Sequence, residues 1–228
     1  FSCLPEREAG YAISDGAVPG QVFRRTGHHG LFHEAAFRSI FEKQPYAGTE
    51  RVISICLEPV PEITAIIGGS PIMVTGGATP LEGIPGETTC GEIDPFIVIN
   101  LSKKLGWGPE QINKMLAEES GILGLTGSRI GLGKLLQGAS RKYDMAKKIL
   151  LYRIIQSCGA AAAAMGGADF IVFSGRYASA GKIIGPMIRR RLPLKKRPAI
   201  LMMEKPLLEI VASSVRRTGK LESCDCAV

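Results

Sequence analysis

Residues 79–95 read TPLEGIPGETTCGEIDP, and this stretch separates two differently patterned parts of the chain. It combines glycine, proline and acidic residues and contains no basic residue. A polar segment rich in glycine and proline between regular elements is typical of a loop with defined turns. Loops that a rigid framework holds in place often carry functional residues. Composition alone favours an ordered connector without a functional role. Whether the loop is functional therefore depends on the motifs around it.

The residues before this stretch predict a helix followed by three short strands. Apolar residues at helical spacing predict an amphipathic helix over 32–43. Three short apolar runs then predict strands, and Gly68 and Gly69 between the second and third are typical of a tight hairpin turn. The predicted strands cover 51–57, 63–67 and 71–75.

The residues after the stretch predict a helical region and then alternating strands and helices. Asp94 is a suitable helix cap and Pro95 suits the first helical position, so a helix begins here, and Gly106 ends it. We interpret 120–127 as a compact turn region. The remaining predicted elements are helices over 109–118, 140–165, 181–191 and 206–217, and strands over 169–174 and 199–203.

This order of elements predicts an α/β fold with one mixed β-sheet flanked by helices. The chain has 228 residues, 45% of them hydrophobic, which is enough for a sizeable core in one large domain. We assign residues 1–20 to an irregular N-terminal segment, 21–217 to the domain and 218–228 to a C-terminal tail.

Composition favours an intracellular, reducing compartment, either the cytoplasm or an organelle matrix. The six cysteines are scattered and only Cys224 and Cys226 lie close together, a spacing that predicts neither a disulfide framework nor a structural zinc site. We expect no transmembrane segment, because no apolar run reaches the length of a membrane span, and no secretory signal is visible. The chain begins with Phe1 rather than methionine, from which we expect a processed or trimmed form.

The net charge of +7 is concentrated near the C-terminus. Residues 1–181 are neutral overall, whereas 182–228 carry 11 basic and 4 acidic residues. Such a run is usually a solvated surface, and its alternative is a patch for phosphate groups, an anionic surface or an acidic protein. Nucleic acid is a possible partner of residues 182–220 through its backbone only, since aromatic residues for base stacking are nearly absent there. The candidate patch consists of Arg189, Arg190, Arg191, Lys195, Lys196 and Arg197.

All three histidines stand at the start of the first predicted long helix. His29 and His33 are four residues apart, so they could face one another across a helical turn and bind a metal ion. The sequence fixes no acidic or cysteine ligand near both histidines, which favours a role without metal.

Several motifs resemble those of acetate kinases. TPLEG (79–83) and CGEIDP (90–95) resemble the family's TPLEG…TRCGDIDP, and RRTGHHGLFH (24–33) resembles RRYGFHGTSH. ESGILG (119–124) and MGGADFIVF (165–173) resemble KSGLLG and MGGVDAIVF. The matches keep order and spacing from about residue 10 to about residue 215, and they cover only the second half of the family's length. The resemblance implies a ribonuclease-H-like domain of the actin-like ATPase class.

The resemblance also implies roles for single positions. His29 matches the family's histidine that stabilises charge on the transferred phosphoryl group, which makes it the candidate catalytic residue. Thr89 stands where the family has an arginine with a similar role, so a positive charge is lost at this position. Glu92 and Asp94 are kept, and capping a helix is a sufficient role for Asp94.

The matched nucleotide-binding turns differ more strongly. CLEPV (56–60) stands where the family's HLGNG cradles phosphate, and it has no glycine, gains Glu58, and includes Pro59, which has no N–H to donate. RYASA (176–180) stands at the adenosine-binding turn. The family's metal-linked glutamate falls near 206–208, where no carboxylate stands, although Glu204 and Glu209 are nearby.

These substitutions lead us to expect a non-catalytic acetate-kinase-like domain, a structural or regulatory subunit that binds no cofactor. Protein partners in a homo- or hetero-oligomer are then expected, with the long helix over 140–165 as a docking face. The alternative is a carboxylate kinase that uses ATP and Mg²⁺ to phosphorylate a short-chain acid, completed by a missing half or a partner chain. A third hypothesis is a nucleic-acid-associated protein that uses residues 182–220.

Overall fold

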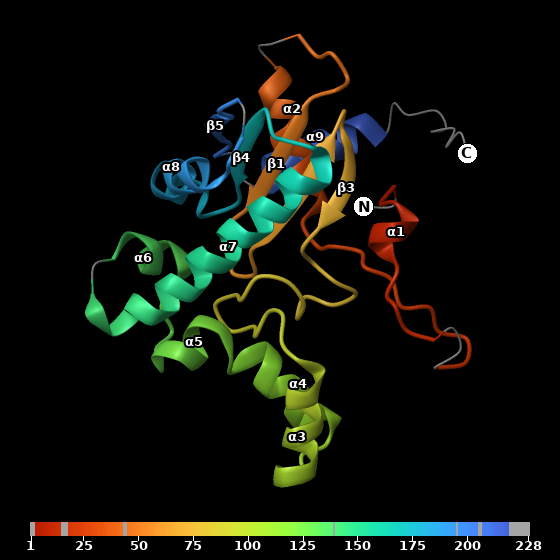
Figure 1. The fold of residues 1–228 in the computed structure, drawn as a ribbon, viewed down its shortest axis with the longest axis vertical. Coiled ribbons are helices and arrows are strands. Elements are labelled where there is room, and N and C mark those ends of the chain that lie inside the picture. Colours follow the sequence, from red (N-terminus) through yellow and green to blue (C-terminus); the bar gives the residue numbers. More distant parts are fainter. Residues whose placement is uncertain are drawn as a thin grey trace.

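The structure is a computed structural model that describes residues 3–14, 18–42, 45–138, 140–194, 196–204 and 207–218. Five strands form one mixed sheet with the order β3-β2-β1-β4-β5 (Figure 1). β2 is antiparallel to both of its neighbours, whereas β1, β4 and β5 run parallel. This arrangement confirms the predicted mixed sheet. The strands are β1 (Arg51–Cys56), β2 (Glu62–Ile67), β3 (Ser70–Val74), β4 (Phe170–Ser174) and β5 (Ala199–Met202).

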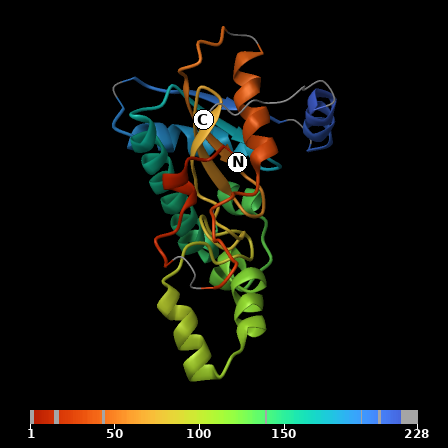
Figure 2. The ribbon, with the colours of Figure 1, turned by 90° about the vertical axis from the view of Figure 1, so that its right-hand side faces the viewer.

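Helices cover both faces of this sheet (Figures 1 and 2). α7 and α8 pack on one face, and α2 and α9 pack on the other. The long helices are α2 (Gly30–Phe41), α3 (Pro95–Leu105), α4 (Pro109–Glu118), α7 (Asp144–Met165), α8 (Gly181–Arg191) and α9 (Leu207–Thr218). Shorter helices are α1 (Glu6–Ala9), α5 (Gly121–Thr126) and α6 (Leu132–Gln137), with 3-10 turns at Arg141–Tyr143 and Ala178–Ala180. No helix of the described residues is long and apolar enough to cross a membrane.

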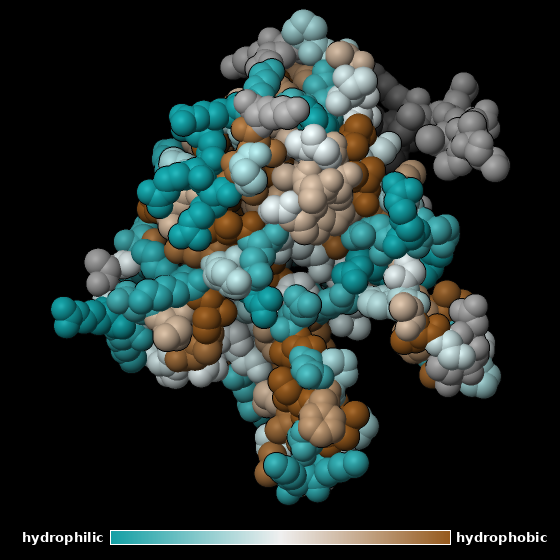
Figure 3. Space-filling view, in the orientation of Figure 1, coloured by the Kyte–Doolittle hydropathy of each residue, from teal (hydrophilic) through white to brown (hydrophobic). Residues whose placement is uncertain are grey.

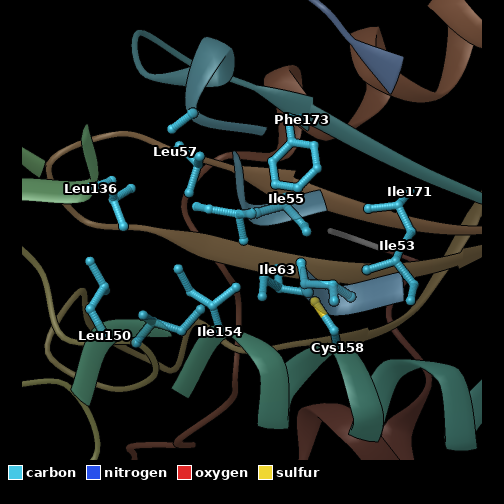
Figure 4. Packing of buried hydrophobic residues seen from close by; sticks show 14 of the residues in the cluster. Ile53, Ile55, Leu57, Ile63, Leu136, Leu150, Ile154, Cys158, Ile171 and Phe173 are labelled. Carbon is cyan, nitrogen blue, oxygen red and sulfur yellow. The ribbon is translucent and has the colours of Figure 1, made fainter. Parts of the chain in front are cut away.

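The main core lies between the sheet and α7. Successive side chains of a strand point to opposite faces, so Ile53 and Ile55 of β1 face α7 while Val52 and Cys56 face α2. Leu150, Ile154 and Cys158 are spaced four residues apart on α7 and point at the sheet (Figure 4). These residues are buried, and their packing fixes α7 across the central strands.

The central loop, residues 79–95, is ordered by its own backbone hydrogen bonds. The N–H of Gly86 donates to the carbonyl of Thr89 at 3.0 Å, and the N–H of Glu87 donates to the carbonyl of Pro59 at 2.7 Å. Gly91 has φ +70°, and a Cβ there would lie 2.6 Å from the nitrogen of Pro85, so only glycine fits without strain. The loop is thus fastened to the turn that follows β1.

The predicted cap at the end of this loop is confirmed. The Asp94 carboxylate accepts the Phe96 N–H at 2.9 Å, Pro95 begins α3, and Gly106 ends it with φ +67°. α3 and α4 then project away from the sheet (Figure 2). α3 carries no buried residue, and hydrophobic surface is visible over this projection at the bottom of Figure 3.

Two sequence-based expectations need correction. Residues 1–20 are predicted to be irregular, but α1 lies there, and Ala9 of this helix and the preceding Leu4 pack against Val74 of the edge strand. The Glu8 carboxylate also accepts the Val74 N–H at 3.0 Å, an edge-strand contact that a local sequence pattern does not reveal. The expected turn region over 120–127 contains α5, a short helix that the repeated glycines of GILGLT concealed and that buries Gly121 and Ile122.

The packing of α7 generates a stability prediction. Ile154→Ala removes a fully buried side chain between α7 and the sheet and should lower the free energy of unfolding by roughly 2–5 kcal/mol. Tyr152→Ala on the same helix, where 57% of the side chain is exposed, should change it by about 0.5 kcal/mol or less. Urea unfolding of the two variants measures both values, and equal losses would contradict this placement of α7.

Candidate functional site

The first residue of β2, Glu62, organises the segment that carries the histidines. Its carboxylate is buried and accepts the backbone N–H of His28 at 2.8 Å and that of His29 at 2.9 Å. These amides lie just before α2, where helix geometry leaves backbone N–H groups without partners. Glu62 therefore connects the sheet to the start of α2 through the backbone, whatever the side chains at 28 and 29.

His33 completes this buried cluster from one turn further along α2. Its Nδ1 lies 2.8 Å from Ser54 Oγ of β1, and its Nε2 lies 3.2 Å from Glu62 Oε1. Both ring nitrogens are therefore engaged with protein partners. A shared metal ion with His29 would require these bonds to break, and the described residues include no group of three or more histidine, cysteine or carboxylate side chains arranged to bind a metal.

The carboxyl group of Glu62 titrates far below its ordinary range. Burial acts to raise its pKa, but the hydrogen bond and charge of His33, together with the His29 amide, outweigh burial and lower the pKa from 4.5 to about 2. Glu62 is therefore ionised at neutral pH, although its side chain is almost inaccessible to solvent. A buried carboxylate is tolerated only when donors surround it in this way.

His29 stands at the mouth of this cluster. It is the residue before the first turn of α2, and its ring is tilted against Phe32 with 6.2 Å between centroids. Nδ1 lies 3.8 Å from Glu62 Oε1 and is buried without a hydrogen-bond partner. Burial lowers the pKa of His29, an effect that the charge of Glu62 partly opposes. The imidazole is thus mainly neutral at pH 7, and it borders an open space beside α2.

That space is a cleft of about 1550 Å³ between α2 and the sheet. His28, His29 and Glu58 line its polar end, and Phe37 and Ile66 line its apolar part. The cleft thus combines titratable groups with an apolar wall, a combination typical of small-molecule sites.

The turns that follow β1 and β4 meet beside the cleft. After β1, the Glu58 carboxylate accepts the backbone N–H of Arg176 at 2.7 Å and its Nε at 2.9 Å. Arg176 belongs to the turn after β4, and Tyr177 next to it donates its hydroxyl to Glu87 of the central loop at 2.8 Å. Hydrogen bonds therefore connect three loops at the carboxyl ends of the central strands β1 and β4.

Thr89 lies inside this arrangement rather than on the cleft surface. Its side chain is buried, and its hydroxyl has no hydrogen-bond partner. A Cβ on Gly86 would come within 2.4 Å of that hydroxyl, so the space around it is tightly filled. The structure therefore places a small, neutral, enclosed side chain at this position.

The basic residues near the C-terminus lie elsewhere. Arg189, Arg190 and Arg191 end α8 and are exposed, as are Lys196 and Arg197, whereas Lys195 and the pair Cys224 and Cys226 lie outside the described residues. Cations in the last turn of a helix also stabilise its dipole. The five described basic residues of this patch are not among the residues that line the cleft, and binding of nucleic acid or an anionic surface there stays a prediction.

Sequence reasoning found His29 and missed Glu62. A signal was present, because EITAII is an otherwise apolar strand that begins with an acid. A charged residue entering a buried strand needs a partner, but the partners are backbone amides 33 and 34 positions away in the chain. Ser54, which holds the His33 ring, was read only as part of a strand.

The low pKa of Glu62 predicts a pH dependence of stability. Because this pKa is depressed on folding, the stabilisation is complete above pH 4.5 and is lost as the pH falls toward about 2. Glu62→Gln should lower the free energy of unfolding at neutral pH by roughly 3 kcal/mol, and the difference from wild type should shrink below about pH 4.5. Urea unfolding across this range measures both effects. The control is Glu110→Gln on the exposed surface of α4, and a pH-independent difference for Glu62→Gln would contradict the assignment.

Three comparisons place this chain among known proteins. A profile of the acetokinase family matches residues 1–184. An acetate kinase from Dictyoglomus thermophilum is 34% identical over 184 residues, which cover 79% of this chain and 46% of that protein. The chain therefore spans about half the length of the curated relatives it matches.

Solved structures show the same fold. The crystal structure of Porphyromonas gingivalis acetate kinase matches with a TM-score of 0.81 and 23% identity, covering 95% of this chain and 61% of that one. A propionate kinase from Francisella tularensis matches with a TM-score of 0.78 and 24% identity, covering 92% and 60%. With the profile match over most of the chain, these findings show that the chain belongs to the acetokinase family, with its actin-like ATPase fold.

Proposed function

We propose that this chain forms one half of a carboxylate kinase, which transfers the terminal phosphoryl group of ATP to a short-chain carboxylic acid. The observation that carries the proposal is the family match over residues 1–184, because it includes His29 and the cluster that holds it. The remaining half of the site would come from residues beyond this sequence, on the same or another chain. This was the alternative reading of the sequence, and the family match favours it.

The reaction fits what His29 offers. A carboxylate oxygen of the acid forms a bond to the γ-phosphorus of ATP, the bond from that phosphorus to the bridging oxygen breaks, and ADP leaves with the electron pair. Such reactions need positioned donors for the phosphoryl oxygens more than covalent chemistry from the protein. Glu62 fixes the backbone of His29 and its ring packs beside Phe32, so a ring N–H at the cleft could serve as such a donor.

The described residues provide no set of side chains that would hold Mg²⁺ by themselves. They contain no group of three or more side chains suited to bind it, and the Glu58 carboxylate is already paired with Arg176. No step of the proposed reaction is therefore assigned to a metal ion. While Arg176 stays paired with Glu58, positive charge would come from the other half of the site, because the neutral ring of His29 and the hydroxyl of Thr89 provide none.

Thr89 and Glu58 favour a second candidate function, a structural or regulatory subunit without kinase activity. The enclosed Thr89 hydroxyl cannot replace a cation, and Glu58 places a negative charge on the cleft. Losing a donor to a developing negative charge costs about 10²–10³-fold in rate. The two functions therefore differ in a measurable quantity, the rate of acyl phosphate formation.

A fusion protein tests the proposed kinase function. The first half of the Dictyoglomus thermophilum acetate kinase is joined to this chain, and acyl phosphate is trapped with hydroxylamine in the presence of acetate, propionate or butyrate, ATP and Mg²⁺. We expect acyl phosphate above background, and His29→Ala should lower the rate about 10²–10³-fold.

Two controls make this experiment decisive. Tyr152→Ala, on the outer surface of α7, should leave the rate of the fusion unchanged. The full-length Dictyoglomus enzyme confirms the assay. A folded fusion without acyl phosphate, or an unchanged rate for His29→Ala, counts against the kinase and for the subunit without activity.

A further inference from the structure

The pairing of Glu58 with Arg176 has the geometry of a filled anion site. One carboxylate oxygen accepts the backbone N–H of Arg176 at 2.7 Å, and the other accepts its guanidinium Nε at 2.9 Å. The Glu58 side chain is only 13% exposed, whereas that of Arg176 is 61% exposed. A backbone N–H together with an arginine is a donor set that proteins use for phosphate and carboxylate groups.

The pair lies where a sheet of this kind binds ligands. β1 and β4 are parallel neighbours, and Glu58 and Arg176 each stand two residues beyond the last paired positions, Cys56 and Ser174. Ligands of open α/β sheets bind outside the carboxyl ends of such strands. Glu58 also lines the cleft together with His29, so the pair borders the candidate site.

The backbone around the pair is built for close approach. Gly175 has φ +86°, and a Cβ there would lie 2.7 Å from the Leu57 carbonyl oxygen and 3.2 Å from Glu58 Oε1. The Tyr177 N–H donates to the same Leu57 carbonyl at 3.0 Å. The two turns are thus locked together, and the Arg176 N–H is aimed at the point that Glu58 occupies.

We propose that Glu58 is an internal occupant of a phosphate site, and that a phosphate group binds by displacing the Glu58 carboxylate from Arg176. The inference rests on the proposed function for the source of that phosphate, a nucleotide. Arg176 then supplies a positive charge to the edge of the cleft, which Thr89 does not. Glu58 acts as a competing anion that weakens phosphate binding until it is displaced.

The opposite end of the same strands contains a matched pair. Asp169 Oδ2 accepts the backbone N–H of Arg51 at 3.0 Å and its Nε at 3.1 Å. In both pairs a carboxylate accepts the backbone N–H and the Nε of an arginine. Asp169 Oδ1 also accepts a terminal guanidinium N–H of Arg51 at 3.0 Å. Neither Arg51 nor Asp169 is among the residues that line the cleft. If the Glu58–Arg176 pair were purely structural, removal of the Glu58 charge should change phosphate affinity no more than removal of the Asp169 charge.

Titration calorimetry of the full 228-residue chain tests the proposal, with inorganic phosphate and with ATP as probes. Glu58→Gln should bind phosphate at least about tenfold more tightly than wild type, because the competing charge is gone. Glu58→Gln combined with Arg176→Gln should lose that gain, and Asp169→Asn should show none. A gain for both probes supports a site for any phosphate group, and a gain for ATP alone supports a nucleotide site.

The proposal is overturned if Glu58→Gln gains affinity for neither probe or if Asp169→Asn gains as much. A measurement on the wild-type chain covers the case in which Glu58→Gln does not fold. Added phosphate should shift the backbone amide NMR signal of Arg176 and leave that of Arg51 in place, and equal or absent shifts overturn the proposal. Neither experiment contains an acid substrate or a first half, so failure of the kinase assay and failure of this inference are separate results.

Discussion

The buried carboxylate of Glu62 is the interaction on which the candidate site depends. It accepts hydrogen bonds from two backbone N–H groups at the start of α2 and lies beside the ring of His33. These contacts fix the position of α2 relative to β2. An ionised carboxylate without these donors would destabilise the sheet. With them, the group remains charged at neutral pH, and the same bonds hold the backbone of His29 at the cleft. Stability and site geometry therefore have a common origin.

The sheet places the remaining parts of the site around that interaction. β1 and β4 run parallel, so their following turns emerge side by side, and the central loop closes over them through Glu87. The turn after β1 contributes Glu58, which lines the cleft. The turn after β4 contributes Arg176, which is paired with Glu58. The glycines that shape these loops are needed because the backbones approach within contact distance.

The positions that depart from the acetokinase pattern have different physical meanings in three dimensions. Thr89 is buried within the central loop, and its hydroxyl has no hydrogen-bond partner. Glu58, by contrast, remains beside the cleft and neutralises a nearby arginine. The loss of one positive charge and the pairing of another act in the same direction, because both reduce the positive charge available near His29.

Local sequence pattern was sufficient to predict most helices and strands, because hydrophobic periodicity, the Asp94–Pro95 cap and Gly106 act over a few residues. It also carried the family motifs and hence His29. It could not show that residues 6–9 form a helix on the edge strand, that Thr89 is enclosed, or that Glu62 and Arg176 find partners 33 and 118 positions away. The sequence by itself determined the order of elements and the identity of the candidate residues. Only the tertiary structure decided their partners, since burial and charge pairing arise when distant segments exclude water together.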